Sequence, residues 1–192
     1  MVWKREHPEG NEAAKVRFDV VPYIGTCGLD LGCGPSKIFE HFIGVDNCLE
    51  TELFGIRMKP DIVVPDCSKM PLFGDRHSDC VFSAHLLEHI EDHEAALAEW
   101  WRLVKVGGHL VLYLPHRDLY PRMGQPGSNP DHKHDFHPTD IVAAMEKVAD
   151  DWDLVVNQTR DQGAEYSCLQ VYRRRKDGAG RAYSFATPRP SK

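Results

Sequence analysis

The stretch GLDLGCGPSKIFEHFIGVD, residues 28–46, decides the fold of this chain. It opens with a short apolar strand around Asp30 and runs into a turn that contains Gly32 and Gly34. Because glycine has no Cβ, these two positions allow a sharp turn and a close approach of the backbone to a bound molecule. A strand that leads directly into a glycine turn therefore predicts a nucleotide-binding α/β unit.

The second strand of this stretch ends on Asp46, where a carboxylate can accept hydrogen bonds from both hydroxyl groups of a ribose. Dinucleotide sites place a third glycine three residues after the second, but Lys37 occupies that position here. The sequence also has no G-x-x-x-x-G-K-[ST] loop to hold phosphates. The turn is therefore expected to bind a nucleoside cofactor that carries no phosphates.

The turn resembles the first motif of the class I S-adenosylmethionine-dependent methyltransferases, an acid-x-G-x-G turn followed by an acid at the end of the second strand. Three later segments resemble further motifs of that family in the same order: DIVVPDCSKM at 61–70, DCVFSAHLLEHI at 79–90 and KVGGHLVLYL at 105–114. The resemblance covers residues 24–172. Ser36 and Val106 depart from it mildly, because they replace a glycine and a proline that the family often has.

Asp30 and Asp46 are sixteen positions apart, which is too few for a full-length helix and its loops at 1.5 Å rise per residue. We therefore predict only a turn or two of helix between the first two strands. This spacing resembles a compact, methyltransferase type 11-like subgroup that is often associated with the synthesis of polysaccharides or cell-surface glycans.

The resemblance implies S-adenosyl-L-methionine as the cofactor and assigns its binding residues. Asp30 and the turn at 32–34 are expected near the methionine moiety, Asp46 at the ribose, and the 66–67 pair at the adenine. Asn47 departs from the apolar residue that the family commonly stacks on the adenine. The predicted cofactor-binding residues are Asp30, Gly32, Cys33, Gly34, Asp46, Asn47, Asp66, Cys67, Ser83 and His85.

The remaining pattern predicts a three-layer, Rossmann-like α/β sandwich. We expect a mostly parallel seven-stranded sheet in the order 3-2-1-4-5-7-6 that ends in a C-terminal antiparallel hairpin. The strands are predicted near 28–31, 42–45, 62–64, 79–83, 109–114, 154–160 and 168–173. Helices are predicted near 11–21, 93–103 and 138–149, the last with Thr139 or Asp140 as a possible start signal. Trp100 and Trp101 are neighbours on a helix, so core packing is expected for both.

A chain of 192 residues suits one domain, predicted at 1–172. Residues 173–192 contain seven Lys or Arg and one Asp, a net +6, so the remainder carries −12 of the total −6. We expect this basic tail to be flexible and the acidic body to disfavour nucleic acid. No membrane span or leader is apparent, and the six cysteines lie singly, so a cytoplasmic protein with reduced thiols is predicted.

The segment PHRDLYPRMGQPGSNPDHKHDFHP, residues 115–138, follows the fifth predicted strand and lacks periodicity. Because the carboxyl ends of the strands line the crevice of such sheets, this segment is a candidate substrate-binding lid. Its histidines can act as general bases, since imidazole titrates near neutral pH. The tentative catalytic residues are His134, Asp135 and His116.

In the segment HLLEH, residues 85–89, His85, Glu88 and His89 would share one face of a helix and could chelate a metal. Many members of the resembled family carry LEH without a metal. We therefore predict no metal at this site.

The leading hypothesis is a methyltransferase that acts on a small molecule or a glycan. Since the methyl group of a sulfonium is already activated, catalysis needs mainly alignment and desolvation, and no catalytic motif reveals the acceptor. One alternative is a catalytically silent cofactor-binding module that serves as a partner subunit or sensor. Another is an NAD-dependent oxidoreductase, which Lys37 disfavours. The oligomeric state stays open.

Overall fold

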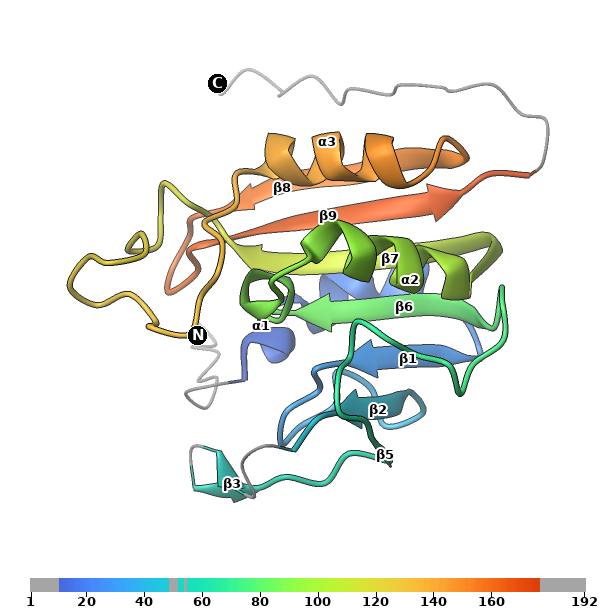
Figure 1. Cartoon of the computed structure of the whole chain (residues 1–192), viewed down its shortest axis with the longest axis horizontal. Coiled ribbons are helices and arrows are strands. Elements are labelled where there is room, and N and C mark those ends of the chain that lie inside the picture. Colours follow the sequence, from blue (N-terminus) through green and yellow to red (C-terminus); the bar gives the residue numbers. More distant parts are fainter. Residues whose placement is uncertain (1–10, 49–51, 54, 177–192) are drawn as a thin grey trace, which may run out of the picture.

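A seven-stranded sheet forms the centre of the computed structural model, which describes residues 11–48, 52, 53 and 55–176 (Figure 1). The strand order is β5-β2-β1-β6-β7-β9-β8. In chain order this is 3-2-1-4-5-7-6, so the predicted topology is confirmed. The strands are β1 (Gly28–Leu31), β2 (Ile43–Asp46), β5 (Ile62–Val63), β6 (Ser78–Ala84), β7 (Val104–Pro115), β8 (Trp152–Arg160) and β9 (Ser167–Arg174).

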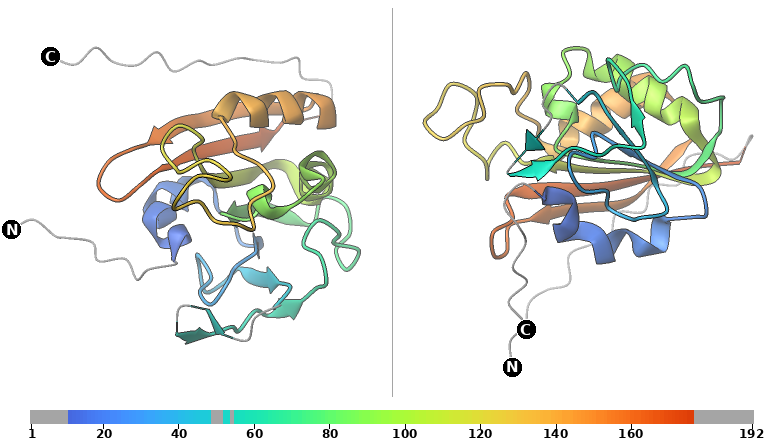
Figure 2. Two further views of the ribbon diagram at one scale, coloured as in Figure 1. Left: turned by 60° about the vertical axis from the view of Figure 1, so that its left-hand side comes forward. Right: turned by 90° about the horizontal axis from the view of Figure 1, so that it is seen from below.

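Helices cover both faces of the sheet, which gives the predicted three layers (Figure 2). On one face lies α1 (Glu12–Val20) with the short η1 (Val21–Tyr23); on the other lie α2 (His93–Leu103) and α3 (Pro138–Val148). One apolar cluster packs between α1 and the sheet and includes Val16, Phe42 and Phe82. The other packs between the sheet and the helices α2 and α3 and includes Trp100 and Met145. No described helix has the length and apolar character that crossing a bilayer requires.

The helix α3 begins at Pro138, as the sequence predicts. His137 is the N-cap, and its backbone N–H donates to the Asp140 carboxylate at 2.9 Å. Pro138 then takes the first helical position, where its fixed φ suits the helix and its missing N–H costs nothing. Asp140, at the third helical position, completes a capping box with His137 and so forms part of the start signal.

The connection between β1 and β2 contains only turns and bends, so the predicted turn or two of helix is wrong. Two side chains hold this connection instead. The Asp30 carboxylate accepts the N–H of Ile38 at 2.6 Å, and the Lys37 ammonium donates to two backbone carbonyls and lies 2.9 Å from the Asp61 carboxylate. Hydrogen bonds between these two charged side chains and the backbone take the place of the hydrogen bonds within a helix.

Two further features were not predicted. A small hairpin, β3 (Glu52–Leu53) with β4 (Ile56–Arg57), leaves the main sheet after β2. The strand β7 begins at Val104 rather than near 109, and the KVGG segment forms an irregularity inside it, where Gly107 has φ +80°.

The last two strands form the predicted antiparallel hairpin, with β9 inserted between β7 and β8. β9 runs through Arg174, so the segment expected to be a tail begins as part of the sheet. Arg174 and Arg175 are both largely buried and lie against Asp151 and Asp153. Residues 177–192 lie outside the described residues, and their flexibility stays a prediction.

Candidate cofactor site

The glycine turn lies at the carboxyl end of β1, beside the end of β6, where the strand order reverses direction. Gly32 and Gly34 both adopt left-handed backbone conformations, with φ +68° and +56°. A Cβ on Gly32 would come within 2.8 Å of Leu86, whereas a Cβ on Gly34 would meet nothing within 4 Å. Gly32 thus packs the turn onto the β6 side, and Gly34 leaves open space for a bound molecule.

Asp46 ends β2 and fixes this turn from the opposite side. Its carboxylate accepts the N–H of Gly34 at 2.9 Å through Oδ2 and the N–H of Cys48 at 3.0 Å through Oδ1. The side chain is mostly buried, and Asn47 follows it directly. A carboxylate held in this way retains lone pairs for the hydroxyl groups of a ribose.

Asp30 is buried beneath the turn, with 2% of the residue exposed. Burial raises the pKa of its carboxyl group to about 7. The hydrogen bond from Ile38 acts in the opposite direction and lowers this pKa, whereas the nearby charge of Asp46 raises it. The structure therefore places Asp30 as a support of the turn.

We expect the free energy of unfolding of the ligand-free protein to depend on pH through Asp30. Its pKa is near 3.8 when unfolded and about 7 when folded, so the folded state binds the proton more tightly. Stability from this group is complete below about pH 4 and is lost as the pH rises through 7. Denaturant unfolding at pH 5, 6, 7 and 8 should show a smaller decline with pH for Asp30→Asn than for wild type. Equal declines in the two proteins would contradict this assignment.

The predicted adenine-binding pair lies close to the same turn. The Cys67 thiol hydrogen-bonds the backbone of Gly32, and burial raises its pKa to about 12. Asp66 forms a local turn in which its Oδ1 accepts the N–H and the hydroxyl group of Ser68. The backbone of this loop is held from below, because the indole N–H of Trp100 donates to the Cys67 carbonyl at 2.8 Å.

Ser83 and His85 lie at the carboxyl end of β6. Ser83 is buried, and its hydroxyl group has no hydrogen-bond partner among the described residues. His85 has φ +49°, so the backbone turns sharply there and the following helical turn, η2, begins only at Leu87. The expectation that His85, Glu88 and His89 share one helix face is therefore wrong. Burial lowers the pKa of His85 to about 3.

Three residues around His85 were not predicted as part of the site. Its Nε2 lies 3.0 Å from the Ser167 hydroxyl and 3.6 Å from a Glu12 carboxylate oxygen, and its ring contacts that of Tyr166. Glu12 lies in α1, Tyr166 directly precedes β9 and Ser167 begins it, so all three are far from His85 in the chain. Only the fold brings them together, and no local sequence signal marks them.

The tentative catalytic residues lie on the long segment after β7, which projects from the carboxyl edge of the sheet (Figure 1). His116 is buried at the end of β7, and its Nδ1 accepts the N–H of Asp118. His134 Nε2 lies 3.0 Å from the carbonyl oxygens of both Ile90 and Glu91, so this nitrogen carries a proton. Asp135 accepts the N–H of Met123. The catalytic roles of all three stay predictions.

The sheet order and the helices on both faces of the sheet define the fold of the class I S-adenosylmethionine-dependent methyltransferases. More particularly, residues 29–112 match the family model described as "Methyltransferase domain". This match covers less than half of the chain and agrees with the class that the sequence resembles. A comparison with curated protein sequences finds no match.

Solved structures share this fold at low sequence identity. A methyltransferase dependent on S-adenosylmethionine from Mesorhizobium loti is 16% identical, with a TM-score of 0.64 over 88% of this chain and 100% of that one. In a complex with the Trm112 methyltransferase activator, a candidate methyltransferase from Haloferax volcanii is 16% identical, with a TM-score of 0.63 over 86% of this chain and 90% of that one. The [4+2]-cyclase SpnF is 13% identical, with a TM-score of 0.60 over 84% and 81%.

Proposed function

We propose that this chain is an enzyme that transfers the methyl group of S-adenosylmethionine to a small-molecule or glycan acceptor. The observation that carries the proposal is the glycine turn, whose Gly34 faces open space while Asp46 retains acceptor capacity beside it. The compact link between β1 and β2 supports the glycan class by resemblance. We also propose a single domain, predicted at 1–172 and extended to Arg174 because β9 ends there, and a cytoplasmic location.

The residues at the crevice fit this cofactor. Bound S-adenosylmethionine supplies a methyl group that is already activated as a sulfonium. The turn at 32–34 would hold its methionine moiety, Asp46 the ribose hydroxyls, and the loop at 66–67 the adenine. Positioning of the acceptor falls to the segment after β7, where His116, His134 and Asp135 are the proposed sources of a base.

A second candidate is a catalytically silent cofactor-binding module that acts as a partner subunit or sensor. Two structural relatives favour keeping it, because one is described in complex with an activator protein and another as a cyclase. The NAD-dependent alternative is weaker. Lys37 stands where the third glycine would be, and its ammonium group is already bound to two carbonyls and the Asp61 carboxylate.

Two measurements test these candidates. Calorimetric titration with S-adenosylmethionine and S-adenosylhomocysteine should show binding at one site per chain, and failure of both to bind would overturn the cofactor assignment. Methyl transfer from labelled S-adenosylmethionine into fractions of a cell lysate should then identify an acceptor. Binding without transfer into any fraction would favour the silent module, whereas protection by NAD in a melting assay would revive the oxidoreductase.

A further inference from the structure

A buried carboxylate near the glycine turn lacks a hydrogen-bond donor among the described residues. Glu88 belongs to η2 (Leu87–His89), just after β6, and none of the residue is exposed. Neither of its carboxylate oxygens accepts a hydrogen bond within the described part of the chain. Burying a carboxylate in this way is costly unless a cation or a set of donors compensates it.

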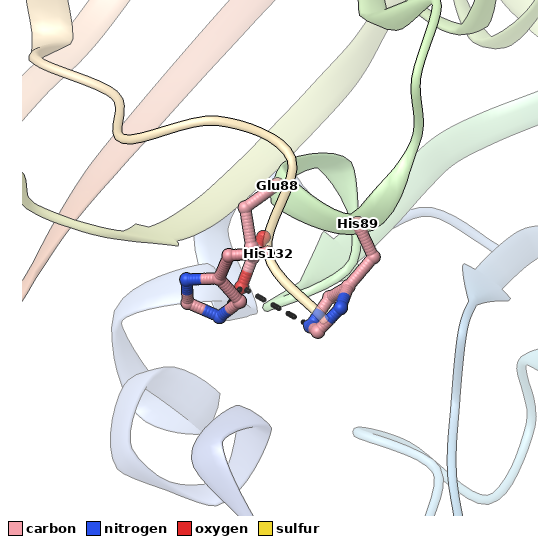
Figure 3. A group of neighbouring side chains, drawn as sticks. All are labelled: Glu88, His89 and His132. Carbon is pink, nitrogen blue, oxygen red and sulfur yellow. Dashed lines mark ion pairs between the residues drawn. The ribbon is translucent and has the colours of Figure 1, made fainter. Parts of the chain in front are cut away.

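Imidazole nitrogens surround this carboxylate at distances slightly longer than direct contact. Glu88 Oε1 lies 3.7 Å from His85 Nδ1, 3.9 Å from His132 Nε2 and 4.0 Å from His89 Nε2. The rings of His89 and His132 lie close together, edge to face, with centroids 4.8 Å apart (Figure 3). One ligand atom from each of Glu88, His89 and His132 lies within 4.8 Å of the other two. The three side chains therefore converge on one point.

The long segment after β7 is held so that His132 reaches this point. The N–H groups of Lys133 and His134 both donate to the backbone carbonyl of Glu88, at 2.7 and 3.2 Å. The ring of His134 also lies against the carbonyl oxygens that follow η2. The position of His132 is thus determined by backbone contacts.

From this arrangement we propose that Glu88, His89 and His132 bind one divalent transition-metal ion. Two imidazoles and one carboxylate suit Zn²⁺, Fe²⁺ or Co²⁺, whereas Mg²⁺ and Ca²⁺ prefer oxygen ligands. The ion supplies the positive charge that the buried carboxylate lacks.

The geometry needs only a small contraction. A point equidistant from three atoms that are about 4 to 4.8 Å apart lies roughly 2.3–2.8 Å from each, compared with about 2.0–2.2 Å for Zn²⁺ bound to nitrogen or oxygen. The His89 ring also hydrogen-bonds the backbone of Asp131, which helps to fix the orientation of the ring.

A second group, His116, Asp118 and His137, also has atoms close enough for a metal, but its groups are already engaged. His116 Nδ1 accepts a backbone N–H, His137 Nδ1 lies 2.8 Å from the Thr139 hydroxyl, and Asp118 pairs with Arg122. It lacks the unpartnered buried carboxylate that distinguishes the first group.

Three protein ligands leave coordination positions open for another molecule. The site lies next to the cofactor turn, because Leu86, two residues before Glu88, packs directly on Gly32. If the proposed function holds, on which this step rests, the open position would take an oxygen of the methyl acceptor. This favours acceptors that carry hydroxyl or carboxylate groups.

Cobalt is a suitable probe, because Co²⁺ in a four- or five-coordinate site absorbs visible light much more strongly than the hydrated ion. The full chain would be treated with a chelator, dialysed and titrated with Co²⁺, with Zn²⁺ then used to displace it. We expect one Co²⁺ per chain and loss of the absorption when Zn²⁺ is added. Mg²⁺ in excess should not displace the cobalt.

Glu88→Gln keeps the volume of the side chain and removes the buried charge, and His132→Gln removes the ligand from the long segment. Each should weaken Co²⁺ binding at least about 100-fold, since even loss of an outer partner of a metal ligand typically costs 10–100-fold. His41→Gln is the matched control. His41 is exposed and lies at the amino end of β2, whereas Glu88 follows the carboxyl end of β6. It should bind like wild type.

Two results would overturn the metal site. One is a spectrum of hydrated cobalt alone, and the other is Co²⁺ affinity in Glu88→Gln and His132→Gln equal to that of wild type. Calorimetry with S-adenosylhomocysteine on the same samples separates the two proposals. Cofactor binding without cobalt binding would reject the metal site and leave the proposed function standing. Cobalt binding without cofactor binding would reject the proposed function and leave the metal site standing.

Discussion

Asp46→Ala is expected to weaken binding of S-adenosylhomocysteine by at least ~1.5 kcal/mol, or more than tenfold, since a hydrogen bond to a charged group is worth about 1.5–3 kcal/mol. The substitution removes the proposed ribose acceptor. It also releases the N–H of Gly34, which the carboxylate holds at 2.9 Å. Calorimetry on wild type and variant measures the difference directly.

Asp79→Ala is the matched control for this experiment. Asp79 likewise accepts backbone N–H groups, from Thr26 and Cys27, but it lies at the amino end of β6, away from the crevice. Its loss should lower the free energy of unfolding and leave cofactor affinity unchanged. If both substitutions weakened binding equally, the loss would reflect general destabilisation, and the ribose role of Asp46 would be rejected.

Trp100→Ala should lower the free energy of unfolding by about 3–5 kcal/mol, the usual cost of removing a large aromatic side chain from a core. Trp100 is fully buried between α2 and the sheet, and its indole N–H donates to the Cys67 carbonyl. Equilibrium denaturation in guanidinium chloride measures the loss. A loss below about 1 kcal/mol would mean that the core relaxes around the gap far more than packed interiors do.

Trp100→Phe separates packing from hydrogen bonding. The smaller ring fills much of the site but leaves the Cys67 carbonyl unpaired, at a cost of about 1–3 kcal/mol. Because that carbonyl belongs to the proposed adenine loop, cofactor binding should weaken as well. Trp101→Phe is the control: its indole N–H donates to Asp151, on the far side of α2, so only stability should fall. If Trp100→Phe and Trp101→Phe changed cofactor affinity equally, the role of the Cys67 loop in adenine binding would be rejected.

The strands and their order could be predicted because local pattern determines them. Each parallel strand is a short apolar run that ends at a turn, and right-handed crossovers then leave few arrangements. The missing helix after β1 could not be predicted as missing, because only the structure shows Asp30 and Lys37 capping the turns. The hairpin β3–β4 has two residues per strand, too short for any periodic signal.

The cofactor turn could be predicted residue by residue, since Gly32, Gly34 and Asp46 lie within one continuous stretch. The surroundings of His85 could not, because Glu12 and Ser167 reach it from opposite ends of the chain. The same limit applies to Glu88 and His132, which are separated by a segment without periodicity. In addition, the positive φ of His85 breaks the helical register on which the HLLEH pattern was interpreted.

The position of β9 between β7 and β8 also affects how the chain folds during synthesis. β8 is made first, but its hydrogen-bonding partner in the sheet is β9, and β9 is also the neighbour of β7. Until Arg174 has left the ribosome, β7 therefore has an unpaired edge and β8 has no place in the sheet. Because a ribosome adds about 5–20 residues per second, this interval lasts on the order of seconds. Two of the seven strands, β8 and β9, therefore join the sheet only when synthesis of β9 is complete.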